Sequence, residues 1–84
     1  MATKTINERD LRQLLAETFA EPVENIRPEV QRAALVGWDS MGALMLMAEF
    51  DERFSLELSA ETSKNMQCVG DVLEFLRQHG ALQN

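Results

Sequence analysis

The stretch GWDSMGALMLMAEFDERF, residues 37–54, places a glycine and an acidic residue just before a long, mostly apolar segment. Asp39 is a favourable helix N-cap, because its carboxylate can accept hydrogen bonds from the free backbone amides of the following turn. The residues after it do not alternate between apolar and polar over a stretch long enough for a strand. A helix from Ser40 to about Phe54 is therefore favoured. Ser40 is then the first helical residue, near the solvent-facing start.

Two further helices are predicted on either side of this segment. Upstream, a helix is expected over about residues 6–19, because Thr5 and Glu8 are spaced as a capping box. Downstream, Ser59 is the expected cap of a short third helix that ends near Met66. The apolar stripe of the first helix consists of Leu11, Leu14, Leu15 and Phe19.

A fourth helix is predicted within CVGDVLEFLRQHG, residues 68–80. Cys68 stands at its N-cap position, Asp71 lies in its first turn, and Gly80 is the expected stop. Its apolar face consists of Val69, Val72, Leu73 and Leu76. Residues 21–37, between the first two helices, show no clean helical period.

We expect this intervening segment to be a long loop packed down by its own apolar residues, with a short helical turn near residues 29–34. The predicted fold is therefore all-α. It is a small four-helix bundle with a long loop between helices one and two and a short third helix. A chain of 84 residues supports one modest core, so residues 1–84 are expected to form a single domain.

The composition is that of a folded, acidic chain. The hydrophobic content of 45% is typical of a globular domain, and no apolar run approaches the roughly 20 residues that span a bilayer. The net charge of -6 repels phosphate backbones, which argues against nucleic acid as a partner. The N-terminus MATKTINERD lacks the apolar stretch of a signal peptide, and Cys68 has no intramolecular partner for a disulfide. We expect a monomer in a reducing cytoplasm.

Little in the sequence supports catalysis. A nucleophilic Ser40 would need a positioned base, yet the only histidine is His79, at the far end of the last predicted helix. No spacing of His, Cys or carboxylate residues indicates a metal site. An exposed serine without activating groups can still be the substrate of a modifying enzyme. The free amides and dipole of a helix start stabilise negative charge, so Ser40 is suited to carry an acidic group such as a phosphate.

Three segments together resemble a known family. Gly37-Trp38-Asp39-Ser40-Met41 resembles the G-x-D-S-[LM] attachment motif of acyl carrier proteins. EFDERFSLEL looks like the acidic end of the family's second helix, and CVGDVLEFL looks like the start of its fourth helix. Aligned on Ser40, these segments need no gap from Gly37 to about Leu76.

The resemblance implies that Ser40 receives a 4'-phosphopantetheine arm from coenzyme A through a magnesium-dependent phosphopantetheinyl transferase. The thiol of the arm would then hold acyl groups as thioesters and deliver them to partner enzymes of fatty-acid, polyketide or cell-envelope lipid biosynthesis. The carrier itself would catalyse nothing. Asp39 and Gly37 correspond to motif residues that present Ser40. The expected partner-binding residues are Met41, Met45, Glu49 and Glu52.

The second helix departs from the fatty-acid carriers, which usually have acidic residues soon after the serine. This chain has Gly42 and Met45 there, and acidic residues return only from Glu49 onward. Arg53 stands where an acid is common, and Cys68 replaces the usual capping threonine. These departures favour a specialised carrier that serves a polyketide, peptide or envelope-lipid pathway. The absence of a histidine before the serine argues against the peptidyl type.

The apolar residues of the second helix are expected to divide between core and surface. Met41 and Met45, four residues apart, are predicted to form an exposed flank that suits a partner or an acyl chain. Gly42 is expected to let the first turn fray. The predicted core residues are Leu44, Leu46, Met47, Phe50 and Phe54.

Two alternatives to a carrier remain open from the residues alone. One is a non-enzymatic helical protein-interaction module, in which the GWDS sequence is only a helix cap. The other is a small hydrolase that uses Ser40. Loading from coenzyme A would separate all three hypotheses.

Overall fold

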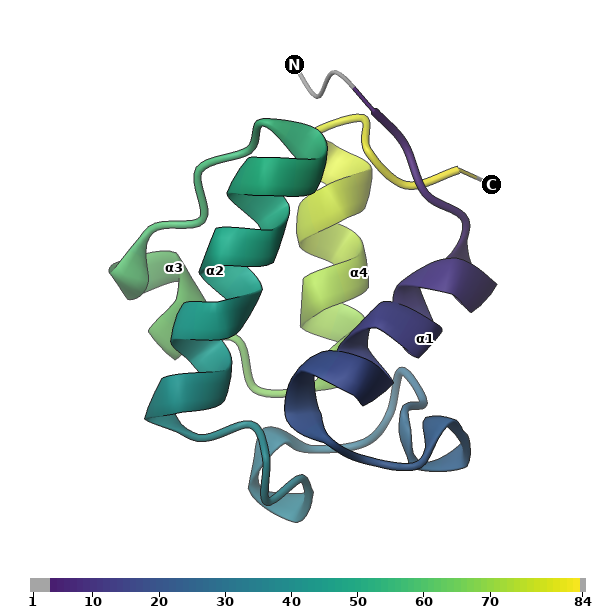
Figure 1. Cartoon of the computed structure of the whole chain (residues 1–84), viewed down its shortest axis with the longest axis vertical. Helices are drawn as coiled ribbons and strands as arrows, with labels where there is room; N and C mark the ends of the chain where they lie inside the picture. The colour runs from purple at the N-terminus through teal and green to yellow at the C-terminus, as the bar shows by residue number, and fades with distance from the viewer. Residues whose placement is uncertain (1–3, 84) are drawn as a thin grey trace.

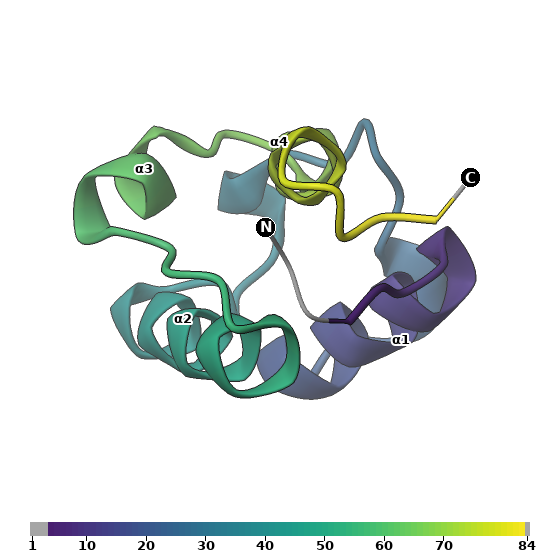
Figure 2. The ribbon, with the colours of Figure 1, turned by 90° about the horizontal axis from the view of Figure 1, so that it is seen from above.

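The computed structural model describes residues 4–83 and consists of four helices, α1 (Glu8–Phe19), α2 (Ser40–Phe54), α3 (Ala60–Asn65) and α4 (Val69–Gln78). Figure 1 shows the four helices from the front, and in the view from above α1 and α2 lie along one side of the molecule, with α3 and α4 along the other (Figure 2). No strand is present between residues 4 and 83, where β-pairing is limited to two isolated bridges. The predicted all-α four-helix fold with a short third helix is confirmed.

The start of α1 differs from the prediction. The helix begins at Glu8, and its cap is Asn7, whose side-chain oxygen accepts a hydrogen bond from the Asp10 amide at 2.7 Å. The prediction that Thr5 and Glu8 form a capping box is therefore wrong. Thr5 instead accepts a hydrogen bond from the side chain of Gln83 at 2.7 Å.

The two ends of the described chain lie side by side. The Ile6 amide donates to the carbonyl of Ala81 at 2.9 Å, and the Gln83 amide donates to the Ile6 carbonyl at 2.8 Å. These bonds form a short parallel bridge between Ile6 and Leu82. Gly80 precedes it with a φ of 72°, which confirms its predicted role as the stop of α4.

The long loop between α1 and α2 is held down by its own apolar residues, as predicted. Ile26, Leu35 and Trp38 are buried in the core, and the loop contains two short 3₁₀ turns, η1 (Val23–Asn25) and η2 (Arg32–Ala34). The predicted turn near residues 29–34 corresponds to η2, which is shorter, whereas η1 was not predicted. Three backbone hydrogen bonds of 2.8–3.0 Å join the loop to the start of α4. The amide of Arg32 donates to the Gln67 carbonyl, and the amides of Val69 and Gly70 donate to the carbonyls of Val30 and Pro28.

One face of α2 supplies the core. Leu46, Phe50 and Phe54 are buried as predicted, and Met47 is partly buried against them. Leu44 was predicted to be a core residue, and this is wrong because 59% of it is exposed. A single turn of helix cannot direct residues 44 and 46 to the same side, since they lie about 200° apart around the axis. The buried positions of α2 are Gly42, Ala43, Leu46, Phe50 and Phe54.

Candidate attachment site

The start of α2 has the geometry predicted from the sequence. Asp39 is the N-cap, and its Oδ1 accepts a hydrogen bond from the Gly42 amide at 2.9 Å. Ser40 follows as the first helical residue and is exposed. Its hydroxyl has no hydrogen-bonding partner among residues 4–83. The side chain is therefore accessible to an enzyme and is not needed to hold the turn.

Two glycines let the backbone pack closely beneath this turn. A Cβ placed on Gly37 would collide with the backbone carbonyl oxygen of Phe19, at the end of α1. A Cβ placed on Gly42 would in turn collide with the carbonyl oxygen of Gly37. The first turn of α2 thus rests on the loop, and the loop rests on α1. Gly42 is buried in a contact that only glycine allows, so close packing opposes the loosening expected from its low helix propensity, and that expectation stays a prediction.

Trp38 anchors the loop that leads into α2, directly before the capping Asp39. Only 3% of it is exposed, and its ring stacks on Phe19 with the centroids 5.1 Å apart. The Arg32 guanidinium lies 5.2 Å from the centre of the same ring and also donates to the Ser63 carbonyl oxygen at 2.9 Å. A buried aromatic residue directly before the cap therefore connects the attachment turn to α1, η2 and α3. No role for Trp38 was predicted from the sequence.

The surroundings of Ser40 contain no catalytic machinery. His79 lies at the C-terminal end of α4, on the opposite side of the molecule from the start of α2 (Figure 1). Its Nδ1 is 2.8 Å from the Phe75 carbonyl oxygen, within its own helix. In the described part of the chain, no group of three or more His, Cys, Asp or Glu residues could hold a metal ion. The chain's one histidine thus lies away from Ser40, so this side chain is not placed to act as a base for it.

The predicted docking residues lie along the outer side of α2. Met41 and Met45 are exposed, by 65% and 46%, and so is Glu52. Glu49 is half-buried and accepts a hydrogen bond from the Nε of Arg53 at 2.6 Å. This hydrogen bond raises the pKa of Arg53 above its usual value. Glu49 is thus already paired within the chain.

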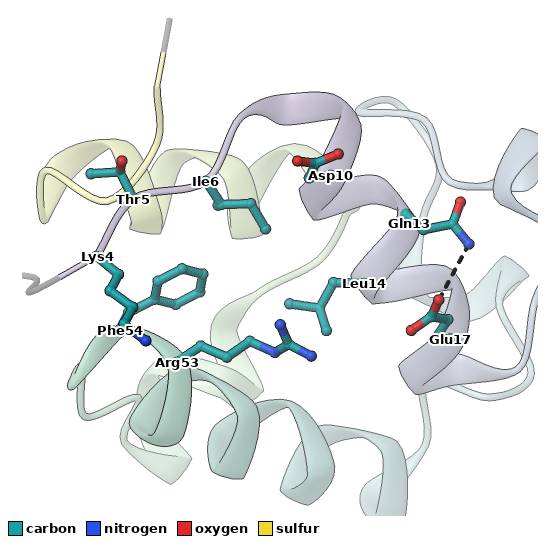
Figure 3. A pocket seen from close by; sticks show the side chains of 9 residues that line it. All are labelled: Lys4, Thr5, Ile6, Asp10, Gln13, Leu14, Glu17, Arg53 and Phe54. Atoms are coloured by element: carbon teal, nitrogen blue, oxygen red, sulfur yellow. Dashed lines mark hydrogen bonds between the residues drawn. The ribbon is translucent and has the colours of Figure 1, made fainter.

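A cavity of about 450 Å³ lies between α1 and the C-terminal end of α2, far from Ser40 (Figure 3). Arg53, on its wall, is 13 residues after Ser40, which is about 20 Å along a helix. Charged side chains of both signs line it, and Leu14 and Phe54 contribute apolar surface. The cavity is not part of the attachment site. Its charged lining residues are Lys4, Asp10, Glu17 and Arg53.

The start of α2 fits a phosphopantetheine group attached through a phosphodiester. The amides of Ser40 and Met41 precede the first backbone hydrogen bond of the helix and are free to face a phosphate oxygen. The first turn of α2 contains no acidic residue, so no side chain of that turn would repel a phosphate attached to Ser40. The hydroxyl, the free amides and the dipole of a 15-residue helix all favour a negative group here.

The described chain is thus a small helical fold with an exposed serine at a helix start, and comparisons with known proteins show its family. Residues 9–76 match the protein family described as "Phosphopantetheine attachment site". The chain is 33% identical over 69 residues to the acyl carrier protein of Phytoplasma mali (strain AT), covering 82% of each chain. It is 22% identical over 72 residues to that of Rickettsia bellii (strain OSU 85-389), covering 86% of this chain and 89% of the relative. The chain therefore belongs to the acyl carrier protein family, whose members carry a phosphopantetheine group and are not catalysts.

Among the helices of residues 4–83, none combines the length and the apolar character that crossing a bilayer requires. The longest, α2, has 15 residues.

Proposed function

We propose that Ser40 is the residue that carries the 4'-phosphopantetheine arm. The observation that supports this most strongly is the exposed Ser40 hydroxyl, which has no partner among the described residues, directly after the Asp39 cap. In loading, Ser40 Oγ forms a bond to the β-phosphorus of coenzyme A. The bond from that phosphorus to the bridging oxygen breaks, and adenosine 3',5'-bisphosphate leaves. The proton of Ser40 passes to a base of the transferase.

Asp39 and Gly37 act as positioning residues in this proposal. Asp39 fixes the first turn through its bond to the Gly42 amide, and Gly37 allows the loop to pass close to α1. When bound, the arm supplies a terminal thiol that holds acyl groups as thioesters. The residues of the chain hold the attachment point in place and expose it to partners.

Partners are proposed to bind the outer side of α2, through Met41, Met45, Glu49 and Glu52. The low charge of the first half of this helix supports a specialised carrier that serves a polyketide, peptide or envelope-lipid pathway rather than general fatty-acid synthesis. We further propose that residues 1–84 act as one monomeric carrier domain in the cytoplasm. The close packing of loop, α1 and α2 around one core supports the single domain.

The test is incubation of the purified chain with coenzyme A and a broad-specificity phosphopantetheinyl transferase, followed by mass spectrometry of the intact chain and its peptides. We expect a gain of one phosphopantetheine on the peptide that contains Ser40. Ser40→Ala should gain nothing and keep its helix content. Ser59→Ala, which changes another exposed serine at a helix start, should still be loaded. No gain on the parent chain would favour the interaction-module hypothesis, and a gain on Ser40→Ala would move the site elsewhere.

A further inference from the structure

Two buried polar side-chain atoms have no hydrogen-bonding partner among residues 4–83. They are the indole Nε1 of Trp38 and the hydroxyl Oγ of Ser63. Only 3% of Trp38 and 2% of Ser63 is exposed. Unpaired groups of this kind lower the stability of a folded chain, because each has given up its hydrogen bonds to water. Core packing alone therefore does not explain why an indole and a hydroxyl stand at these two positions.

The two unpaired atoms belong to one group of side chains, because Trp38 and Ser63 both contact Arg32. The guanidinium carbon of Arg32 lies 5.2 Å from the centroid of the Trp38 ring, and its Nη1 donates to the Ser63 carbonyl oxygen at 2.9 Å. Ser63 lies on α3, which is across the molecule from α2 (Figure 2). We call these three residues the donor cluster. It extends from the segment that precedes the attachment turn to the short third helix.

The donor cluster is rich in hydrogen-bond donors and short of acceptors. An indole N–H and a guanidinium can only donate, and a serine hydroxyl can donate as well as accept. The Ser63 carbonyl oxygen already accepts from Arg32 and from the Met66 amide, at 2.9 and 3.2 Å. Among residues 4–83, Arg32 forms no ion pair with a carboxylate. A single acceptor oxygen is the group that would satisfy the indole and the hydroxyl together.

The attachment serine lies close enough to bring such an oxygen to the cluster. Trp38 precedes Ser40 by two residues, so their Cα atoms are at most about 7 Å apart. The other side of the cluster is able to move, because α3 has only six residues and a helix of that length is not stable through its own hydrogen bonds. A shift of α3 and of the half-buried Arg32 side chain opens the path to both unpaired atoms.

We propose that Trp38 Nε1 and Ser63 Oγ are specificity-determining groups for the cargo, and that both donate to an oxygen atom of the acyl chain beyond the thioester. The cargo class is then an oxygenated acyl group, such as a β-keto or β-hydroxy acyl chain. A saturated chain brings no acceptor and leaves both groups unpaired. This inference rests on the proposed role of Ser40, and it narrows the cargo from acyl groups in general to one chemical class.

The first test compares the full chain in its unloaded form with three loaded forms, which carry the arm alone, a hexanoyl arm or a β-ketohexanoyl arm. Trp38 is the only tryptophan, so its indole N–H gives one resonance in a nitrogen–proton correlation spectrum. We expect this resonance to move downfield with the β-ketohexanoyl arm only. The same shift with the arm alone would assign the acceptor to an amide carbonyl of the arm and overturn the selectivity for cargo. Equal positions with the hexanoyl and β-ketohexanoyl arms would also overturn it.

Melting temperatures give a second readout. The β-ketohexanoyl form of the parent chain should melt about 4–8 °C above the hexanoyl form, and Ser63→Ala and Trp38→Phe should each remove at least half of this gap. Unloaded Ser63→Ala should melt no lower than the parent, because its hydroxyl has no bond to lose. Ser59→Ala is the control, since it removes the cap of the same helix and should lower all forms alike.

Two results would be decisive against the donor cluster. One is a melting gap that persists in both Ser63→Ala and Trp38→Phe, and the other is the absence of a gap in the parent chain. Because Ser63→Ala keeps the Trp38 indole, its spectrum still reports on the hydrogen bond if Trp38→Phe does not fold. If the parent chain gains no phosphopantetheine at all, the proposed function of Ser40 fails instead.

Discussion

The two halves of α2 pack the same inner face against the core, but their solvent-exposed outer sides differ in chemistry. The inner face is continuous, from Ala43 through Leu46 and Phe50 to Phe54, and all four residues belong to one core. The outer face is apolar near Ser40 and charged from Glu49 to Arg53. Because core packing needs only the inner face, the change on the outer face has no structural cause. Contiguous exposed apolar patches mark interaction sites in many proteins, and the predictions below test the division between the two faces in order of expected effect.

The largest effect is expected from a matched pair of leucines on opposite sides of the first half. Leu46→Ala should lower the free energy of unfolding by about 2–5 kcal/mol, because Leu46 is fully buried and its loss leaves a cavity. Leu44→Ala should change it by less than about 0.5 kcal/mol. Urea denaturation followed by circular dichroism measures both. Equal losses in the two variants would contradict the assignment of inner and outer faces.

Gly42→Ala is expected to have the next largest effect. An added Cβ meets the Gly37 carbonyl oxygen, so the first turn or the loop must shift, at a cost of about 1–3 kcal/mol. Helix propensity alone predicts the opposite sign, because alanine is favoured over glycine by about 1 kcal/mol. The sign of the change in unfolding free energy therefore distinguishes close packing from local propensity. Amide exchange around Ser40 should become faster in this variant, and slower exchange would support local propensity.

Asp39→Ala should cost about 0.5–2 kcal/mol, the usual range for removing an N-cap side chain. The bond from the Gly42 amide to Asp39 Oδ1 is lost, and the start of α2 frays. Asp39→Asn keeps an oxygen acceptor and serves as the control, with little change in stability expected. If Asp39→Ala changes the unfolding free energy by less than a few tenths of a kcal/mol, another group caps the helix.

The smallest effect is predicted for the charged half of α2. Glu49→Gln removes the ion pair to Arg53, whose side chains are 38% and 51% exposed, and should cost no more than about 0.5 kcal/mol. The cost should disappear in high salt. Glu52→Gln is the control, because Glu52 forms no ion pair within residues 4–83. A loss above 1 kcal/mol for Glu49→Gln would show that this half contributes more to folding than its exposure indicates.

Much of the fold could be predicted because its signals are local. The capping residues Asp39 and Ser59 and the stop at Gly80 each act within a few residues, and all three are confirmed. The start of α1 was missed because two overlapping signals compete there. The spacing of Thr5 and Glu8 matches a capping box, but the Asn7 side chain caps the helix in practice.

The site was predicted less completely, because its details depend on contacts between distant residues. A helix apolar on both sides, such as α2, does not reveal from periodicity alone which leucine faces the core, so Leu44 was misplaced. The close approach of Gly42 to Gly37 and of Gly37 to Phe19 requires knowledge of how the loop packs on α1. The position of Ser40 could be predicted because its cap and its exposure are set by neighbours in sequence.

The bridge between Ile6 and Leu82 has a practical consequence for the movement of the carrier. Lys4, Thr5 and Ile6 share a cavity wall with Arg53 and Phe54, so this bridge lies at the end of α2 remote from Ser40. A linker joined to residue 4 or to residue 83 would therefore leave the molecule at the same pole. Such a linker would set the radius over which the whole domain swings, and Ser40, at the opposite end of α2, would lie at the outer rim of that swing.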